Sequence, residues 1–111
     1  LAGPISVLTS DFPAPVKDMM SHASRSTATR HAEAKKAGKV LRPYNRFMMY
    51  RAAYADRTKQ FAASDSHRDV SRILGVSWRL ESEDVVEHFN KCSILDSENH
   101  QKAFPGYKYA P

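Results

Sequence analysis

The sequence predicts an all-helical domain, and three observations support this fold class. Apolar and aromatic side chains recur at helical spacing through three stretches between residues 46 and 103, as in helices that bury one face. Asn, Ser or Asp residues, which are good N-caps, precede each stretch. A length of 111 residues with 41% hydrophobic residues fits one domain with a small helical core.

The first helix is expected over about 46–61. Asn45 is its predicted N-cap, and Pro43 favours an extended conformation at Arg42. Its inward-facing residues are predicted to be Phe47, Tyr50, Tyr54 and Phe61.

Met48 and Met49 fall off this inward face, so we expect both to be unburied. The arginines that flank them are Arg42, Arg46 and Arg51. An apolar wedge surrounded by phosphate-seeking charge is how proteins pry open the DNA minor groove. A core helix in which methionines fill gaps explains the same residues, and this segment alone leaves both interpretations open.

The second and third helices are expected over about 67–80 and from Ser82 or Asp84 to about 103. Their apolar positions are Val70, Ile73, Leu74 and Trp78, then Val85, Val86 and Phe89. Pro105 and Gly106 end the third helix, and the extended residues after them are expected to pack beside the arm that contains Pro43.

Residues 1–40 are predicted to form a flexible basic arm, because prolines interrupt the segment and no apolar period lasts two turns. A brief helix within 31–39 is expected to stop at Gly38. The arm carries six basic and three acidic residues, whereas 42–111 carries eleven and nine, a net charge of only +2.

The sequence contains no signal for several classes of protein. The single Cys92 excludes an internal disulfide and fits a reducing compartment. No apolar run approaches the ~20 residues of a membrane span, and no signal peptide is visible. Without a phosphate-binding loop, nucleophile elbow or paired carboxylates, the sequence predicts neither an enzyme nor a cofactor. The net charge of +5 fits nucleic acid or an anionic surface.

Three blocks in register carry a family resemblance. They are Arg42-Pro43-x-Asn45-x-Phe47, then Ser71-x-x-Leu74-Gly75-x-x-Trp78, then His100 with Phe104-Pro105-x-Tyr107-Lys108-Tyr109-x-Pro111. Residues 42–111 thereby resemble the HMG box, in the sequence-specific branch that includes fungal mating-type proteins. We therefore expect a box over 41–111.

The resemblance implies an L-shaped three-helix domain, with extended N- and C-terminal arms packed together, that binds the DNA minor groove with its concave face. Met48 matches the side chain that inserts between base pairs, and Asn45 and Ser71 match residues that contact base edges. The residues expected to contact the DNA backbone are Arg42, Arg46, Arg51, Arg68 and Tyr107. The aromatic core that holds the limbs is expected to be Phe47, Tyr50 and Trp78.

The resulting functional prediction is a nuclear, sequence-selective transcription factor, of the fungal mating-type kind, that bends A·T-containing double-stranded DNA, with a possible partner transcription factor. The alternative is a degenerate box that binds a partner protein through its acidic third helix. The acids of that region, expected to face outward, are Glu81, Glu83, Asp84, Glu87, Asp96 and Glu98. They predict weakened DNA binding, partly restored by Arg25, Arg30, Lys35, Lys36, Lys39 and Arg42.

Two other patterns have competing interpretations. Residues 70–77 look like the centre of a helix-turn-helix with Gly75 at its turn, but the following helix would be acidic and repelled by phosphate. His88, Cys92, Asp96 and His100 lie four residues apart, a spacing that suits metal ligands. We expect instead a half-buried Cys92 and His100, an exposed His88 and Asp96, and no metal.

Overall fold

The computed structural model describes residues 1–110 and shows only helices as regular elements in that range. They are α1 (Ile5–Leu8), α2 (Met19–Ala23), α3 (Thr27–Ala37), α4 (Arg46–Ala62), α5 (His67–Leu80) and α6 (Glu83–Ala103). The all-helical prediction is confirmed. Within the described range, none of these helices has the length and apolar character that a membrane span requires.

The three long helices begin where capping side chains satisfy their free N–H groups. The Asn45 side chain accepts a hydrogen bond from the N–H of Met48 at 2.8 Å, and Ser66 and Ser82 cap α5 and α6 in the same way. Helix α5 continues through Gly75, so the helix-turn-helix interpretation is wrong.

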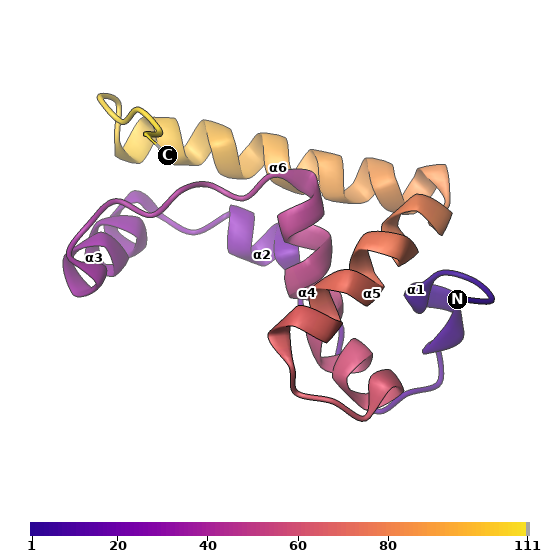
Figure 1. The fold of residues 1–111 in the computed structure, drawn as a ribbon. Helices are drawn as coiled ribbons and strands as arrows, with labels where there is room; N and C mark the ends of the chain where they lie inside the picture. The colour runs from indigo at the N-terminus through magenta and orange to yellow at the C-terminus, as the bar shows by residue number, and fades with distance from the viewer. Residues whose placement is uncertain (111) are drawn as a thin grey trace.

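Helices α4 and α5 descend from one half of α6, which gives the L shape (Figure 1). An aromatic cluster lies where the three helices meet. The Tyr50 ring centroid is 4.9 Å from that of Trp78 and 5.5 Å from that of Phe89, and Phe47 contacts Trp78 edge-on. These packed rings confirm the predicted aromatic core. Phe61 is 40% exposed and takes no part in it, contrary to expectation.

A buried chain of hydrogen bonds runs beneath this cluster. Burial raises the pKa of the Tyr50 phenol, so the group keeps its proton, and its O–H donates a hydrogen bond to the Glu81 carboxylate at 2.7 Å. The Ser77 hydroxyl is then the donor to the Tyr50 oxygen, at 2.5 Å. Helix α1 completes the chain, since the Ile5 N–H donates to Ser77 and the Ser6 hydroxyl donates to Glu81.

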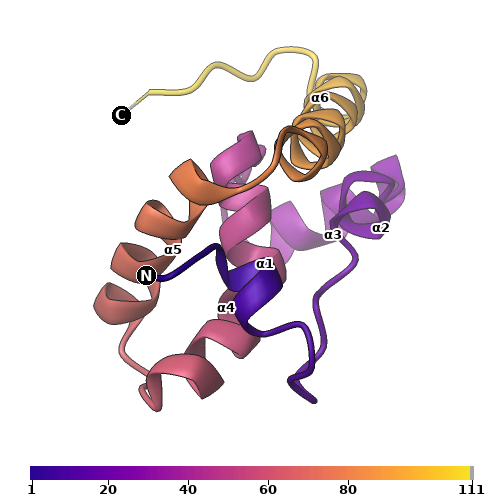
Figure 2. The ribbon, with the colours of Figure 1, turned by 90° about the vertical axis from the view of Figure 1, so that its right-hand side faces the viewer.

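Residues 1–40 differ from the flexible arm that we expected, because they form three short helices packed on the box. Ile5, Met19 and Ala23 are buried in the common core. Helix α1 packs against α4, and α2 packs against α4 and α6. Burial of these side chains thus depends on distant parts of the chain, which a local apolar period cannot reveal. Helix α4 lies between α5 on one side and α2 with α3 on the other (Figure 2). The brief helix that ends at Gly38 is present as α3, with Gly38 left-handed at φ 74°.

A buried carboxylate fastens this segment to α6. Asp96 is fully buried, and its carboxylate accepts hydrogen bonds from Arg30 at 2.8 Å and from the Tyr44 N–H at 3.0 Å. Arg25 lies 3.5 Å away. The expectation that Asp96 is exposed is therefore wrong. Its position in the apolar stripe of α6 aims it inward, and the arginines that balance its charge come from a segment 66 to 71 residues earlier.

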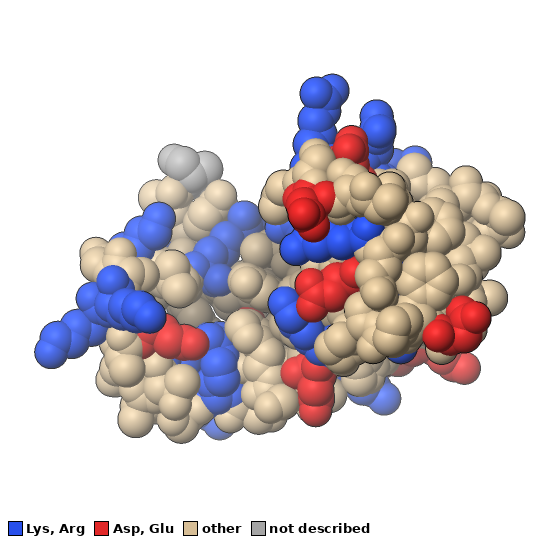
Figure 3. All heavy atoms as spheres, turned by 90° about the horizontal axis from the view of Figure 1, so that it is seen from below, with Lys and Arg blue, Asp and Glu red and all other residues tan. Residues whose placement is uncertain are grey.

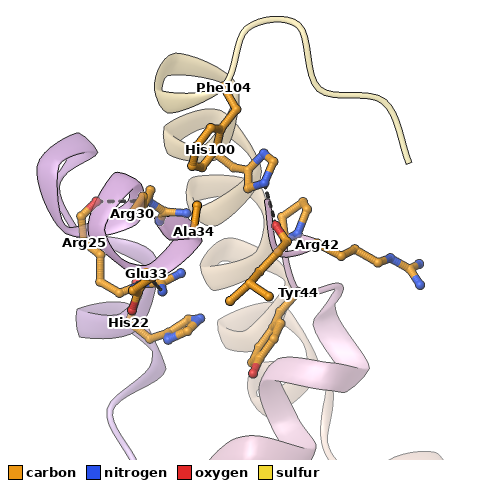
Figure 4. Close-up of a pocket in the computed structure, with 11 residues that line it drawn as sticks. His22, Arg25, Arg30, Glu33, Ala34, Arg42, Tyr44, His100 and Phe104 are labelled. Carbon is orange, nitrogen blue, oxygen red and sulfur yellow. Dashed lines mark hydrogen bonds and ion pairs between the residues drawn. The ribbon is translucent and has the colours of Figure 1, made fainter. Parts of the chain in front are cut away.

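Further contacts surround this ion pair at the junction of α2, α3, α6 and the extended residues 39–45, called the N-terminal arm (Figure 4). The His22 ring stacks on Tyr44 at 4.8 Å, and burial with nearby Arg25 lowers the pKa of His22. His100 hydrogen-bonds the Leu41 carbonyl at 2.8 Å. A small hollow lies at this junction. Arg25 and Arg30, two of the charged side chains that line it, are already paired with acids of the protein, so we interpret the hollow as a packing seam and not as a ligand site.

The N- and C-terminal arms pack together as the resemblance implies. The Arg42 guanidinium lies 4.2 Å from the ring centroid of Tyr109. Tyr107 packs edge-on against His100, which also holds the N-terminal arm.

Replacing Asp96 with Asn tests the importance of the buried ion pair. The amide still accepts from the Tyr44 N–H but leaves the Arg30 charge buried without a counter-ion. Breaking a buried pair in this way costs about 3–5 kcal/mol, so urea unfolding should show a loss of that order. The control is Glu98→Gln, an exposed acid of the same helix, and a loss below about 1 kcal/mol for Asp96→Asn would contradict the assignment.

Candidate nucleic-acid interface

A shallow groove opens between α4 and the first half of α5. It is lined by Tyr44, Met48, Arg51, Ala52, Ala55, Lys59, Asp65, His67, Val70 and Ser71. The small side chains of Ala52 and Ala55 leave space on this side of α4, and the longer side chain of Met48 lies next to them. Seen from below, the molecule is hollowed between the lobe of α4 and α5 and the end that carries α3, with Lys and Arg side chains along the hollow (Figure 3).

Only one of the two methionines is available to a ligand. Met48 is partly exposed and lines the groove. Met49 is fully buried in the core, so the expectation that both are unburied is wrong for it. The buried side of α4 is wider than the aromatic stripe, because the N-terminal segment covers the side on which Met49 lies. Met49 is therefore the methionine that fills the core, and Met48 is the one left at the groove surface.

Asn45 lies next to the groove residue Tyr44, at the end of α4 that carries Met48. It is exposed, and its side-chain oxygen is already used as the helix cap. The two N–H donors of its amide remain. Minor-groove edges of A·T pairs present acceptors only, so the donors left to Asn45 are complementary to them.

Ser71 lies on the opposite wall of the groove, on α5. Its hydroxyl oxygen is covered and has no hydrogen-bond partner within residues 1–110. An enclosed hydroxyl without a partner costs free energy.

The predicted backbone contacts surround this site. Arg51 lines the groove, with its guanidinium 5.9 Å from the Phe47 ring centroid, and Arg46 and Arg68 are exposed at the starts of α4 and α5. Arg42 and Tyr107 lie on the two arms, outside the groove. The four arginines form no ion pair with the described residues, so their charges are available to phosphate.

The N-terminal segment leaves the groove open. It hydrogen-bonds α4 at Ala53, Arg57 and Gln60. At 100° per residue these positions centre roughly 140° around the helix from the groove positions 48, 52, 55 and 59. The segment therefore covers a side of α4 that is turned away from the groove.

Sequence reasoning missed the residues that shape the groove. Ala52, Ala55 and Lys59 continue from Met48 at spacings of four, three and four residues, which marks one helix face. That periodicity was available, but alanines carry no chemistry of their own that points to a ligand. Tyr44 and Val70 contribute the apolar wall, and Asp65 places one acid at the far end.

Comparison with known proteins identifies the domain. Residues 40–108 match the family model of the HMG (high mobility group) box, which is more than half of the chain. The chain belongs to the HMG-box family. HMG boxes bind DNA and are not enzymes.

Fungal regulators are among the relatives of this box. The chain is 40% identical over 72 residues to "Transcription factor ste11" of Schizosaccharomyces pombe, covering 65% of this chain and 14% of that protein. It is 31% identical over 97 residues to "HMG-box protein STE11" of Pneumocystis carinii, covering 83% and 18%. It is 34% identical over 79 residues to "Mating-type M-specific polypeptide Mc" of Schizosaccharomyces kambucha, covering 71% and 44%.

The chain thus spans less than half the length of each of these relatives. No solved structure matches it.

The two methionines give a direct test of the site's geometry. Met49→Ala removes a buried side chain and should lower the free energy of unfolding by about 2–5 kcal/mol. Met48→Ala lies at the groove surface and should cost less than about 1 kcal/mol. Both values come from urea unfolding, and a reversed order would place residue 48 in the core and residue 49 at the surface.

Proposed function

We propose that this box is the DNA-binding domain of a fungal transcription regulator of the mating-type kind, which acts in the nucleus on double-stranded DNA. The groove carries the proposal, because it is lined by a partly exposed Met48 together with Arg51, and the exposed Asn45 caps the same helix three residues before Met48. The names of the relatives support the class of regulator.

In the proposed mechanism, Met48 enters the minor groove and separates two stacked base pairs, which kinks the duplex toward the major groove. Unstacking costs a few kcal/mol per step, and the kinked duplex offsets this cost by contacting more of the concave face. The backing for the wedge is rigid, since Asn45 fixes the first turn of α4 and Met49 is anchored in the core beneath it.

Sequence preference has two sources in this scheme. Asn45 and Ser71 contact base edges in the minor groove, where A·T pairs are distinguished mainly from G·C pairs. The cost of bending the duplex also depends on its sequence. Arg42, Arg46, Arg51, Arg68 and Tyr107 contact the backbone and set the register without reading bases.

A second candidate function is binding of a partner regulator through α6. Its first turns expose Glu83, Asp84 and Glu87, which lie outside the groove and suit a basic partner surface. The two functions are compatible, because the groove and this acidic surface do not share residues.

Titration with an A·T-rich duplex tests the first function. Binding should weaken between about 50 and 200 mM salt with a clearly negative slope of log K against log salt, because phosphate contacts release counter-ions. The variant Arg46→Ala/Arg68→Ala should bind more weakly with a shallower slope. Absence of binding at the lower salt concentration would reject DNA as the ligand and favour the protein partner.

Met48→Ala tests the wedge in a bending assay. Losing the thioether side chain should reduce the bend angle of the bound duplex more than it reduces affinity, because the phosphate contacts remain. A pair of fluorophores at the duplex ends reports the angle at saturating protein. Leu80→Ala, an exposed apolar residue at the end of α5, is the matched control, and a normal bend with Met48→Ala would refute the wedge assignment.

A further inference from the structure

Basic side chains accumulate at the end of the molecule where α3 lies, the left end of Figure 3. Lys35 and Lys36 belong to the last turns of α3, and Lys39 follows its Gly38 cap. All three are exposed, and none pairs with an acid within residues 1–110. Neither the groove nor the box match from residue 40 accounts for them.

These lysines have a defined position relative to the box. Arg30 of α3 is held by Asp96, and His31 contacts the Ala103 carbonyl at 2.8 Å, so both attach α3 to α6. The Glu33 carboxylate of the same helix is occupied by Arg25. The acids near α3 are thus engaged internally, while its lysines face solvent on sides that the box leaves uncovered.

The N-terminal arm limits how far these lysines lie from the wedge. Its seven residues, 39–45, span at most roughly 25 Å when fully extended. A duplex rises 3.4 Å per base pair along each strand, so the end of α3 lies within roughly seven base pairs of a step opened by Met48. A duplex seated in the groove and following the arm therefore passes this basic end.

We propose that Lys35, Lys36 and Lys39 form an accessory phosphate-binding surface, the α3 patch, which extends the DNA interface of the box beyond the minor-groove site. The partner is the sugar–phosphate backbone of the same duplex, on the side of the wedge that the N-terminal arm follows. The inference rests on the proposed DNA binding of the groove. The α3 patch adds affinity and salt dependence without adding base recognition.

The test compares three versions of the 111-residue chain on a duplex of about 25 base pairs, which is long enough to reach both the groove and α3. They are the wild type, the triple variant Lys35→Ala/Lys36→Ala/Lys39→Ala, and a control triple variant, Lys17→Ala/Arg79→Ala/Lys91→Ala. The control removes the same charge from exposed positions outside the groove and α3. Affinity is measured from about 50 to 200 mM salt, and the bend angle at saturation.

Each phosphate contact contributes about 0.9 to the slope of log K against log salt. The α3 triple variant should therefore lose about two to three units of slope and more than about tenfold in affinity at 100 mM salt. Its bend angle should equal that of the wild type, and the control variant should keep nearly the wild-type slope.

A wild-type slope in the α3 variant would overturn the proposal, as would an equal loss in the control variant, which would mean that only net charge matters. If the wild type itself fails to bind the duplex, the proposed function fails first and this inference with it. Normal bending and affinity in the α3 variant would instead leave the groove intact and remove only the α3 patch.

Discussion

The arrangement of this chain depends on one buried carboxylate. Asp96 contacts a side chain of α3 and the backbone of the N-terminal arm at once, through Arg30 and the Tyr44 N–H. A buried ionised group is tolerated only when its charge and lone pairs are satisfied. The carboxylate therefore requires α3, α6 and the N-terminal arm to pack against one another. Tyr44 immediately precedes Asn45, and the ion pair therefore also fixes where α4 and its groove begin. A polar group in the core here specifies the geometry of the binding surface.

The same constraint changes the charge balance available to DNA. Arg25 and Arg30 belong to the basic segment expected to strengthen phosphate binding, but both face Asp96 and are engaged inside the protein. In the proposed DNA complex, the charge that contacts phosphate then comes from the arginines around the groove and from the lysines at the end of α3. The acidity of α6 is correspondingly less unfavourable than its sequence indicates, because Asp96 is neutralised and Glu83, Asp84 and Glu87 lie away from the groove.

Local signals in the sequence predicted much of the fold. The three long helices begin at Asn45, Ser66 and Ser82, and their bounds lie within one or two residues of those expected, because capping and helical periodicity are short-range effects. The burial of Met49 and the docking of residues 1–40 were not predictable in this way. Each depends on contacts with partners far along the chain. Met19 and Ala23 span only one helical turn and Ile5 lies 14 residues before Met19, so no apolar period lasts two turns. Of the candidate site, Met48, Arg51 and Ser71 do share one groove, whereas the roles of the predicted DNA contacts remain predictions.

The position of Met48 between the packed core and an open groove gives the proposed wedge a mechanical basis. A flexible thioether can separate stacked bases only if the backbone beneath it does not yield. Here the neighbouring side chains on both sides are fixed, Phe47 against Trp78 and Met49 within the core. The N-terminal segment adds to this backing, since it packs on a side of α4 turned away from the groove and contributes no residue to the groove lining. The packing that supports α4 and the groove that is open to a ligand therefore lie on different faces of this helix. Residues 1–39, which lie outside the match to the box, can support α4 without covering the groove.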